Sequence, residues 1–423
     1  MLVCRNGRSD SLVLEGRVVA PAQGIDECLR IEIENGVIAA LEPTTANPLV
    51  IAPAFVDPHV HLRTPGREDE ETIRSGTEAA AAGGYCAILA MPNTDPVVDS
   101  ASVLGALLER AREDALVPTG FMAAISKGQE GRELTEMVEL AATGAAGFTD
   151  DGRPVVSAGL MRRALQYSAL AARPLALHCE DPALSAGGHA HEGAVSAELG
   201  LGGYPSVAES VMVERDVSLA AYEGRPLHVM HVSARESVDA LRAAQARGIA
   251  ATGEATPHHL CLTDEAVRTL DPNTKMNPPL RAEEDRRALV VALRDGTIGA
   301  VATDHAPHAR HEKEAPFEEA PFGVIGLETA FPALYTRLVL PGVLTLETVL
   351  ERMSAGPARV LGLPEPRIAV GARANLVALD LEATWAVSEN GFRSRSQNSW
   401  LIGETLRGKV VRTIADGREV YAA

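Results

Sequence analysis

The sequence has no long apolar run. Across its 423 residues, stretches such as Ala79–Ala82 and Ala87–Met91 fall far short of the roughly 20 residues that a membrane-spanning helix needs. Arg5 and Arg8 stand near the N-terminus with no apolar stretch after them, so we expect no secretory signal. These two absences argue against a membrane protein and make the cytoplasm the expected location.

Cysteine is scarce, and positive charge is outnumbered by negative charge. The five cysteines are scattered without CxxC spacing, which argues against a disulfide framework and against a thiolate zinc site. The formal net charge of −18 repels nucleic acid and membrane surfaces. A small anionic substrate would therefore need a local cationic pocket.

What is present is typical of a globular protein. Hydrophobic residues make up 46% of the chain and charged residues 23%, which is an ordinary balance. The length fits one large barrel with an accessory domain, or two or three ordinary domains.

Both ends of the chain carry strand patterns. Apolar residues alternate on either side of Asn35-Gly36, and similar segments flank Asp416-Gly417. Such dipeptides supply the positive φ angles that a tight hairpin requires. We predict one small β domain built from residues 1–50 and 365–423.

The middle of the chain, residues 51–364, alternates short apolar strands with helical stretches rich in Ala, Leu, Arg and Glu. This pattern indicates βα units around a parallel sheet. Eight strands are predicted: Ile51–Asp57, Tyr85–Met91, Thr119–Ala124, Ala145–Thr149, Pro174–His178, Leu227–His231, Ile249–Glu254 and Ile298–Asp304. Eight units favour an α/β fold of the closed (β/α)8 TIM-barrel type. An open doubly wound sheet is the alternative, but no Gly-rich nucleotide loop follows the first strand.

Candidate metal ligands stand at the predicted strand ends, where a barrel builds its active face. His59 and His61 follow the first strand with the i, i+2 spacing that puts both imidazoles on one face. This pair alone is a weak signal, because two ordinary polar residues could stand there. Three further strands end at His178, His231 and Asp304, and imidazole with carboxylate suits zinc. Together these residues predict a metal centre.

The fourth strand is followed by the acid pair Asp150-Asp151 and then Gly152. Adjacent acids before glycine usually form a turn. Here the pair arrives at the barrel rim between the other ligands, where a carboxylate could bridge two metal ions. Neighbouring side chains point apart, so we expect only one of the two to bridge.

The chain resembles the class I dihydroorotases of the amidohydrolase superfamily essentially from end to end. The motifs that carry the resemblance are Asp57–Arg63, Met91–Thr94, Gly147–Gly152, His178–Asp181, His231–Ser233, Thr256–Leu260, Asn277–Arg281 and Ala302–His308. Several of these motifs together are highly specific, whereas one alone would not be.

The resemblance implies a centre of two zinc ions. It assigns His59, His61 and Asp304 to the first ion, His178 and His231 to the second, and Asp151 to the bridge between them. Hydantoinases and allantoinases use a carboxylated lysine as the bridge, whereas an aspartate is familiar among class I dihydroorotases.

The implied activity is the reversible, zinc-dependent opening of the cyclic amide of (S)-dihydroorotate to N-carbamoyl-L-aspartate in de novo pyrimidine (UMP) synthesis. Asp304 would act as base and then as acid. Arg63, two residues past His61, offers a planar fork for the ring carboxylate, although a surface salt bridge is the plainer interpretation. The resemblance places six further residues around the substrate: His61, Asn93, Asn277, His308, Phe322 and Gly323.

Residues 309–323 are rich in charge and proline, and we expect a mobile loop that acts as a lid over the site.

Two other functions remain in competition. Another cyclic amidase, such as a hydantoinase or allantoinase, is disfavoured by the acid pair and by Arg63, Asn93 and His308 together. A non-catalytic partner of aspartate carbamoyltransferase is disfavoured because all six ligand positions are filled. A homodimer and an association with the transferase both stay open.

Overall fold

The computed structural model describes residues 1–45 and 49–423. Its centre is a barrel of eight parallel strands, which run side by side in two groups, β5-β6-β7-β8 and β9-β12-β13-β14. A bridge between Phe148 and Leu175 joins the groups on one side, and a bridge between Val60 and His305 joins them on the other. The sheet is therefore closed, and the predicted TIM barrel is confirmed. The strands are β5 (Phe55–Val60), β6 (Tyr85–Ala90), β7 (Thr119–Ala123), β8 (Gly147–Phe148), β9 (Ala176–Leu177), β12 (Leu227–Val229), β13 (Ala251–Ala255) and β14 (Ala300–Val301).

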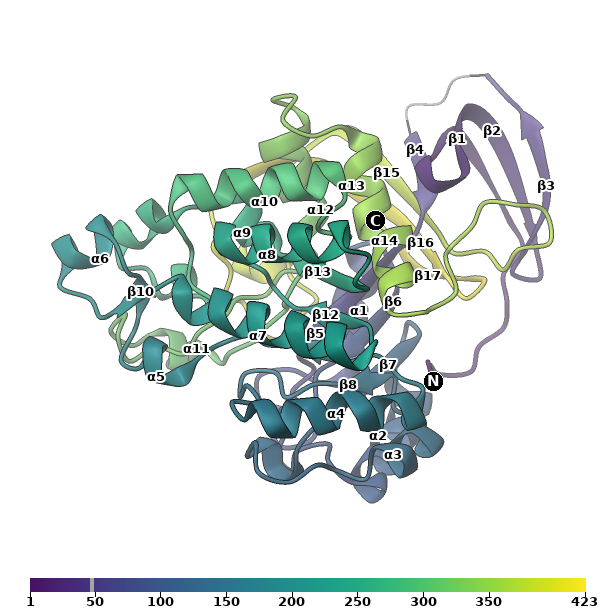
Figure 1. Cartoon of the computed structure of the whole chain (residues 1–423). Coiled ribbons are helices and arrows are strands. Elements are labelled where there is room, and N and C mark those ends of the chain that lie inside the picture. Colours follow the sequence, from purple (N-terminus) through teal and green to yellow (C-terminus); the bar gives the residue numbers. More distant parts are fainter. Residues whose placement is uncertain (46–48) are drawn as a thin grey trace.

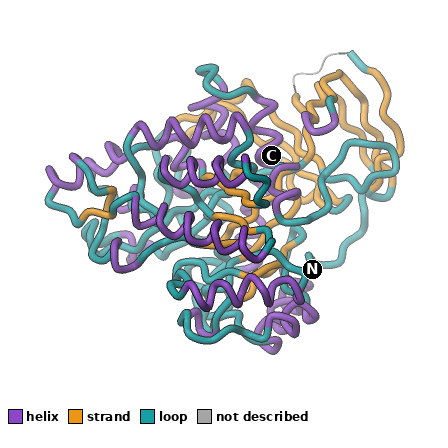
Figure 2. The backbone as a smooth tube through the Cα atoms, viewed as in Figure 1, coloured by secondary structure: helices purple, strands orange, loops and turns teal. Residues whose placement is uncertain are grey.

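Helices follow the strands and surround the barrel (Figure 1, Figure 2). Their apolar residues recur at helical spacing, as in α8, where Val238, Leu241 and Ala244 are buried. The longer helices are α1 (Ile73–Ala82), α2 (Ala101–Asp114), α3 (Met137–Thr143), α4 (Ala158–Ala171), α7 (Val207–Glu223), α8 (Arg235–Ala246), α10 (Glu283–Asp295) and α13 (Leu346–Met353). Short elements between them are α5 (Pro182–Ser185), β10 (Ala190–His191), α6 (Ala194–Leu199), β11 (Gly203–Tyr204), α9 (Pro257–Cys261), α11 (Arg310–Lys313), α12 (Ala330–Leu334) and α14 (Ala355–Val360).

Both termini contribute to one separate sheet beside the barrel, as Figure 1 shows in purple and yellow. Its strand order is β17-β16-β15-β4-β1-β2-β3. The central strand β4 pairs parallel to β1 and antiparallel to β15, so it joins the two ends of the chain. The small β domain from both termini is therefore confirmed. Its strands are β1 (Leu12–Ala20), β2 (Ile25–Glu34), β3 (Val37–Pro43), β4 (Leu49–Pro53), β15 (Leu376–Ala386), β16 (Thr405–Ala415) and β17 (Arg418–Ala422).

The prediction of one barrel strand over Ile51–Asp57 is wrong. Two strands meet there: β4 ends at Pro53 in the small sheet, and β5 begins at Phe55 in the barrel. The change of sheet occurs at Ala54, whose N–H donates to the carbonyl of Asn375 at 3.0 Å. Because both strands are buried, the apolar run continues across the break and nothing in the sequence marks it.

Every helix within the described residues falls short of the length and apolar character needed to cross a bilayer.

Candidate metal centre

β5 ends in two histidines that face the same way. His59 and His61 alternate with Val60 in extended backbone, and their ring centroids lie 5.2 Å apart. Asp57 accepts hydrogen bonds from the N–H of His59 at 3.1 Å and from the N–H of Thr303 at 3.2 Å. These bonds tie the end of β5 to the end of β14.

The Asp151 carboxylate lies among four imidazoles. Its oxygens are 3.5 Å from Nε2 of His59, 3.5 Å from Nε2 of His61, 3.5 Å from Nε2 of His231 and 3.6 Å from Nδ1 of His178. Two triads with the ligand spacing of a metal site result, and Asp151 belongs to both of them.

Asp304 completes the cluster from the end of β14. One of its oxygens lies 3.1 Å from Nε2 of His61 and 3.3 Å from Nε2 of His59. Its side chain is 12% exposed, against 5% for Asp151, so it is the more accessible of the two carboxylates. The structure thus brings together all six residues that the sequence predicted as ligands.

Nε2 of His59 shows whether a metal fits this cluster. The atom is buried and has no hydrogen-bond partner among the described residues. The opposite ring nitrogen, Nδ1, lies 3.0 Å from Oε1 of Glu254. A carboxylate only accepts, so Nδ1 carries a hydrogen and Nε2 is left to bind a proton or a metal ion in the cluster. A histidine held in this way by an outer carboxylate is typical of metal sites.

The electrostatics of the cluster favour a bound cation. Burial lowers the pKa of His59, but Asp304 and Asp151 outweigh this effect and hold its pKa well above the ordinary value. Burial raises the pKa of Asp151, but His59 and the neighbouring imidazoles hold that pKa well below its usual range. Positive charge is therefore strongly stabilised here, and imidazole with carboxylate is a ligand set that zinc accepts.

Two acids behind the histidines were missed by the sequence analysis. Glu254 contacts His59 through one oxygen and Nε2 of His228, at 2.9 Å, through the other. Glu180 lies 2.8 Å from Nε2 of His178. Signals for both exist in the sequence, because Glu254 ends a predicted strand and Glu180 stands two residues after His178, the spacing of His59 and His61.

Asp150 points away from the cluster. Its carboxylate accepts hydrogen bonds from the N–H of Ile125 at 2.8 Å, from the N–H of Ser126 at 3.1 Å and from the Ser126 hydroxyl. Burial raises the pKa of Asp150 to about 6, against these hydrogen bonds. Only the second acid of the pair therefore enters the cluster.

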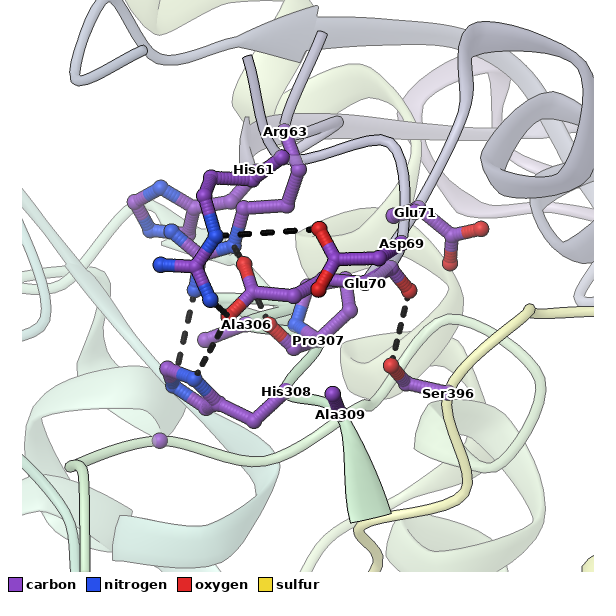
Figure 3. Close-up of polar contacts among 12 residues, drawn as sticks. His61, Arg63, Asp69, Glu70, Glu71, Ala306, Pro307, His308, Ala309 and Ser396 are labelled. Carbon is purple, nitrogen blue, oxygen red and sulfur yellow. Dashed lines mark hydrogen bonds and ion pairs between the residues drawn. The ribbon is translucent and has the colours of Figure 1, made fainter. Parts of the chain in front are cut away.

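Arg63 and His308 lie together beside the cluster (Figure 3). Nη2 of Arg63 is 3.5 Å from Nε2 of His308. Nε of Arg63 donates to the carbonyl of Pro307 at 3.0 Å and lies 3.0 Å from the buried Glu70 carboxylate. An ion pair between Arg63 and Glu70 is thus fixed beside the cluster.

Asn93 contacts the cluster directly. Its amide oxygen lies 2.9 Å from Nδ1 of His61, so Nδ1 donates and Nε2 of His61 faces Asp151 and Asp304. Asn93 therefore orients His61 in the structure, in addition to the substrate contact predicted for it.

The remaining predicted substrate residues come from two loops. Nδ2 of Asn277 donates to Glu180 at 3.1 Å, while its buried Oδ1 has no partner among the described residues. The carbonyl of Phe322 lies 2.8 Å from Nε2 of His308. Gly323 has a φ of 110°, and a Cβ there would lie 2.6 Å from Cβ of Ala306, so only glycine fits.

Two lysines hold the loop 309–323. Nζ of Lys313 donates to the carbonyls of Pro272 and Pro321 at 2.9 and 2.8 Å. Nζ of Lys275 donates to the carbonyls of Glu318 and Ala320 at 2.8 and 2.7 Å. These bonds attach the loop to residues 272–275, and its mobility and its role as a lid stay predictions.

Comparison with known proteins gives a consistent result. A family model described as dihydro-orotase-like matches residues 49–237. A dihydroorotase of Syntrophus aciditrophicus is 46% identical over 97% of this chain and 99% of its own. A dihydroorotase of Anaeromyxobacter dehalogenans is also 46% identical, over 98% of both chains.

Solved structures resemble the chain over almost its whole length. The L-hydantoinase (dihydropyrimidinase) of Arthrobacter aurescens superposes with a TM-score of 0.85 at 26% identity, covering 97% of this chain and 96% of its own. A D-hydantoinase superposes with a TM-score of 0.82 at 22% identity, covering 96% of this chain and 94% of its own. The second likeness concerns the fold alone.

Proposed function

The chain belongs to the dihydroorotase family and is a cyclic-amide hydrolase, and from this premise we propose that it interconverts (S)-dihydroorotate and N-carbamoyl-L-aspartate with the help of zinc. The observation that carries the proposal is the Asp151 carboxylate in contact with four imidazoles at 3.5 to 3.6 Å. Nε2 of His59 also supports it, because this buried atom has no hydrogen-bond partner in the described part of the chain.

The proposed centre holds two ions. His59, His61 and Asp304 would bind the first, His178 and His231 the second, and Asp151 would bridge them. The two overlapping triads around Asp151 support this division. By the same resemblance we propose membership of the class I group, because an aspartate stands where hydantoinases carry a carboxylated lysine.

Bound zinc would polarise the scissile carbonyl and lower the pKa of the attacking water. Asp304 is the proton carrier of the proposed reaction. Its carboxylate is the more exposed of the two acids in the cluster, so it can accept the proton of the water. The same carboxyl then delivers that proton to the departing amide nitrogen.

The substrate carboxylate would bind to Arg63, Asn93 and His308. The free edge of the Arg63 guanidinium can pair with it through two hydrogen bonds. Asn277 would contact the ring amide, and the backbone of Phe322-Gly323 would cover the ring, with His61 beside it. Burial of Arg63 strengthens such a pairing, since water competes less for the charge.

Further proposals concern the whole protein. We assign residues 54–364 to the barrel and residues 1–53 and 365–423 to the small β domain, because β4 ends in the small sheet at Pro53 and β5 begins in the barrel at Phe55. The five unpaired cysteines suit a reducing compartment such as the cytoplasm. The pathway would be pyrimidine synthesis. A homodimer and an association with aspartate carbamoyltransferase stay predictions.

Substitution of the β5 histidines tests the metal proposal. His59→Ala and His61→Ala should each reduce bound zinc and abolish hydrolysis of dihydroorotate, because each removes a ligand. His311→Ala, which changes an exposed histidine, is the matched control and should keep both. Full zinc content with normal turnover in either β5 variant would refute the assignment.

A further inference from the structure

Glu180 lies between a proposed metal ligand and a proposed substrate contact. Its Oε2 is 2.8 Å from Nε2 of His178 and 3.1 Å from Nδ2 of Asn277. The Ser185 hydroxyl donates to its other oxygen. With a side chain only 13% exposed, the carboxylate has these neighbours rather than bulk water as partners.

The carboxylate dictates how both neighbours are oriented. A glutamate is ionised at neutral pH and then only accepts hydrogen bonds. His178 must therefore offer Nε2–H, which directs Nδ1 into the cluster, 2.9 Å from Nε2 of His231 and 3.6 Å from Asp151. Asn277 must likewise offer its NH2 group, which turns its amide oxygen away from Glu180.

That amide oxygen is an unused acceptor. Oδ1 of Asn277 is buried and receives no hydrogen bond from the described residues. A buried acceptor without a donor costs free energy, and a ligand that brings an N–H group recovers this cost.

We propose that Glu180 is a positioning residue that fixes two hydrogen-bond directions at once: it presents Nδ1 of His178 to the metal and Oδ1 of Asn277 to an amide N–H of the substrate. The inference rests on the proposed function, which places Asn277 at the ring amide. It makes Glu180 a specificity determinant for substrates that carry N–H at the scissile nitrogen.

The reaction chemistry agrees with such an acceptor. Hydrolysis breaks the bond between the ring carbonyl carbon and its nitrogen, and the ring N–H becomes the terminal NH2 of the carbamoyl group. The nitrogen is a donor before and after cleavage, so one fixed acceptor serves both directions. A ligand with carbon in place of this nitrogen leaves the acceptor unpaired, and sites built around a polar contact reject such analogues strongly.

Glu180→Met tests the inference with two probes that differ only at this nitrogen. N-carbamoyl-L-aspartate carries the NH2 group, and N-acetyl-L-aspartate carries a methyl group in its place. Inhibition of initial dihydroorotate hydrolysis gives both affinities. The parent should prefer the carbamoyl probe by about 10- to 100-fold, the range expected for one buried hydrogen bond.

In Glu180→Met, which fills a similar volume without an acceptor, the preference should fall at least about 10-fold. Asn277 then lacks the oxygen that holds its NH2 group, so it can turn this group toward the substrate. Asp181→Asn removes a neighbouring carboxylate charge and should keep the preference of the parent.

Glu180→Gln provides the decisive readout. His178 and Asn277 contact the same oxygen, Oε2, so the glutamine oxygen can take its place while the glutamine NH2 group faces the Ser185 hydroxyl. The preference of Glu180→Gln should therefore stay close to that of the parent, a rescue that depends on the acceptor and not on the charge. An unchanged preference in Glu180→Met, or a Glu180→Gln variant as impaired as Glu180→Met, would overturn the inference. A parent that does not hydrolyse dihydroorotate would instead overturn the proposed function.

Discussion

At the scale of single residues, Asp150 and Asp151 face opposite sides of the chain after β8. Asp150 accepts hydrogen bonds from the backbone of Ile125 and Ser126, which joins the ends of β7 and β8. Asp151 contacts the histidines of the cluster. The sequence predicted that only one acid would bridge, because adjacent side chains point apart; the choice of the second came from the family resemblance.

The two acids should differ sharply on substitution. Asp150→Asn should retain most of the bound zinc, because the amide oxygen still accepts the backbone hydrogen bonds. Asp151→Asn should lose most of it, because the neutral amide is a poor ligand for two cations. Elemental analysis of both variants, purified in parallel, measures the difference. Greater loss in Asp150→Asn would mean that the assignment is shifted by one residue.

Other residue roles depend on distant partners. His59 and His61 could be predicted, because strand periodicity puts both on one face. Glu70 could not, because its contacts with Arg63 and His308 join segments that are 7 and 238 residues apart. No local pattern in the sequence predicts these contacts.

At the scale of elements, the amino groups of two buried lysines hold the loop 309–323. Lys275 and Lys313 each donate to two carbonyls, and neither forms an ion pair within the described part of the chain. Burial lowers the pKa of Lys313 to about 7, and Lys275 adds to this effect. The attachment of the loop 309–323 to residues 272–275 therefore depends on pH.

Lys313→Met should reveal this dependence. From pH 7 to about 10 the unfolded chain holds the proton of Lys313 while the native protein releases it, so the free energy of unfolding rises with pH. Below pH 7 both states hold the proton and the contribution is flat. The Tm of the parent minus that of Lys313→Met should therefore grow between pH 7 and 10.

Lys127→Met is the control for this measurement, because Lys127 is exposed and its pKa is raised by the Glu133 carboxylate. Its Tm difference from the parent should not grow over the same range. A Tm difference for Lys313→Met that stays constant or shrinks would contradict the role given to Lys313.

The strand elements themselves were largely predictable. All eight barrel strands lie within or next to predicted apolar runs, because parallel strands buried on both faces read as continuous apolar segments. The same property hid the break at Ala54, where the chain leaves one sheet for another without a polar residue between them.

At the scale of the whole molecule, residues of both domains form the hydrogen bonds that position the active face of the barrel. The C-terminal segment between β15 and β16 crosses to the barrel, where Asn398 donates to the carbonyl of Ala306 at 3.0 Å and accepts from the N–H of His308 at 3.1 Å. Ser396 donates to the carbonyl of Glu70 at 2.7 Å, as Figure 3 shows. The sequence predicted this segment only as part of a β domain, because its contacts are all long-range.

The protein is a cyclic-amide hydrolase, and we propose that its substrate carries a carboxylate. Arg63 is the group that would distinguish dihydroorotate from uncharged relatives, since it is the buried guanidinium beside the cluster. Arg63→Lys keeps the charge but cannot reproduce the planar fork of donors. It should lower kcat/KM for dihydroorotate by roughly 30- to 1,000-fold, equivalent to about 2–4 kcal/mol, with zinc content unchanged.

The most direct test is the ratio of kcat/KM for dihydroorotate to kcat/KM for dihydrouracil, which lacks the carboxylate, measured on the zinc-loaded parent and on Arg63→Lys. We expect this ratio to be large in the parent and much smaller in the variant, whose activity on dihydrouracil should change little. A parent that hydrolyses dihydrouracil or a hydantoin as well as dihydroorotate would contradict this expectation and favour a hydantoinase-like enzyme.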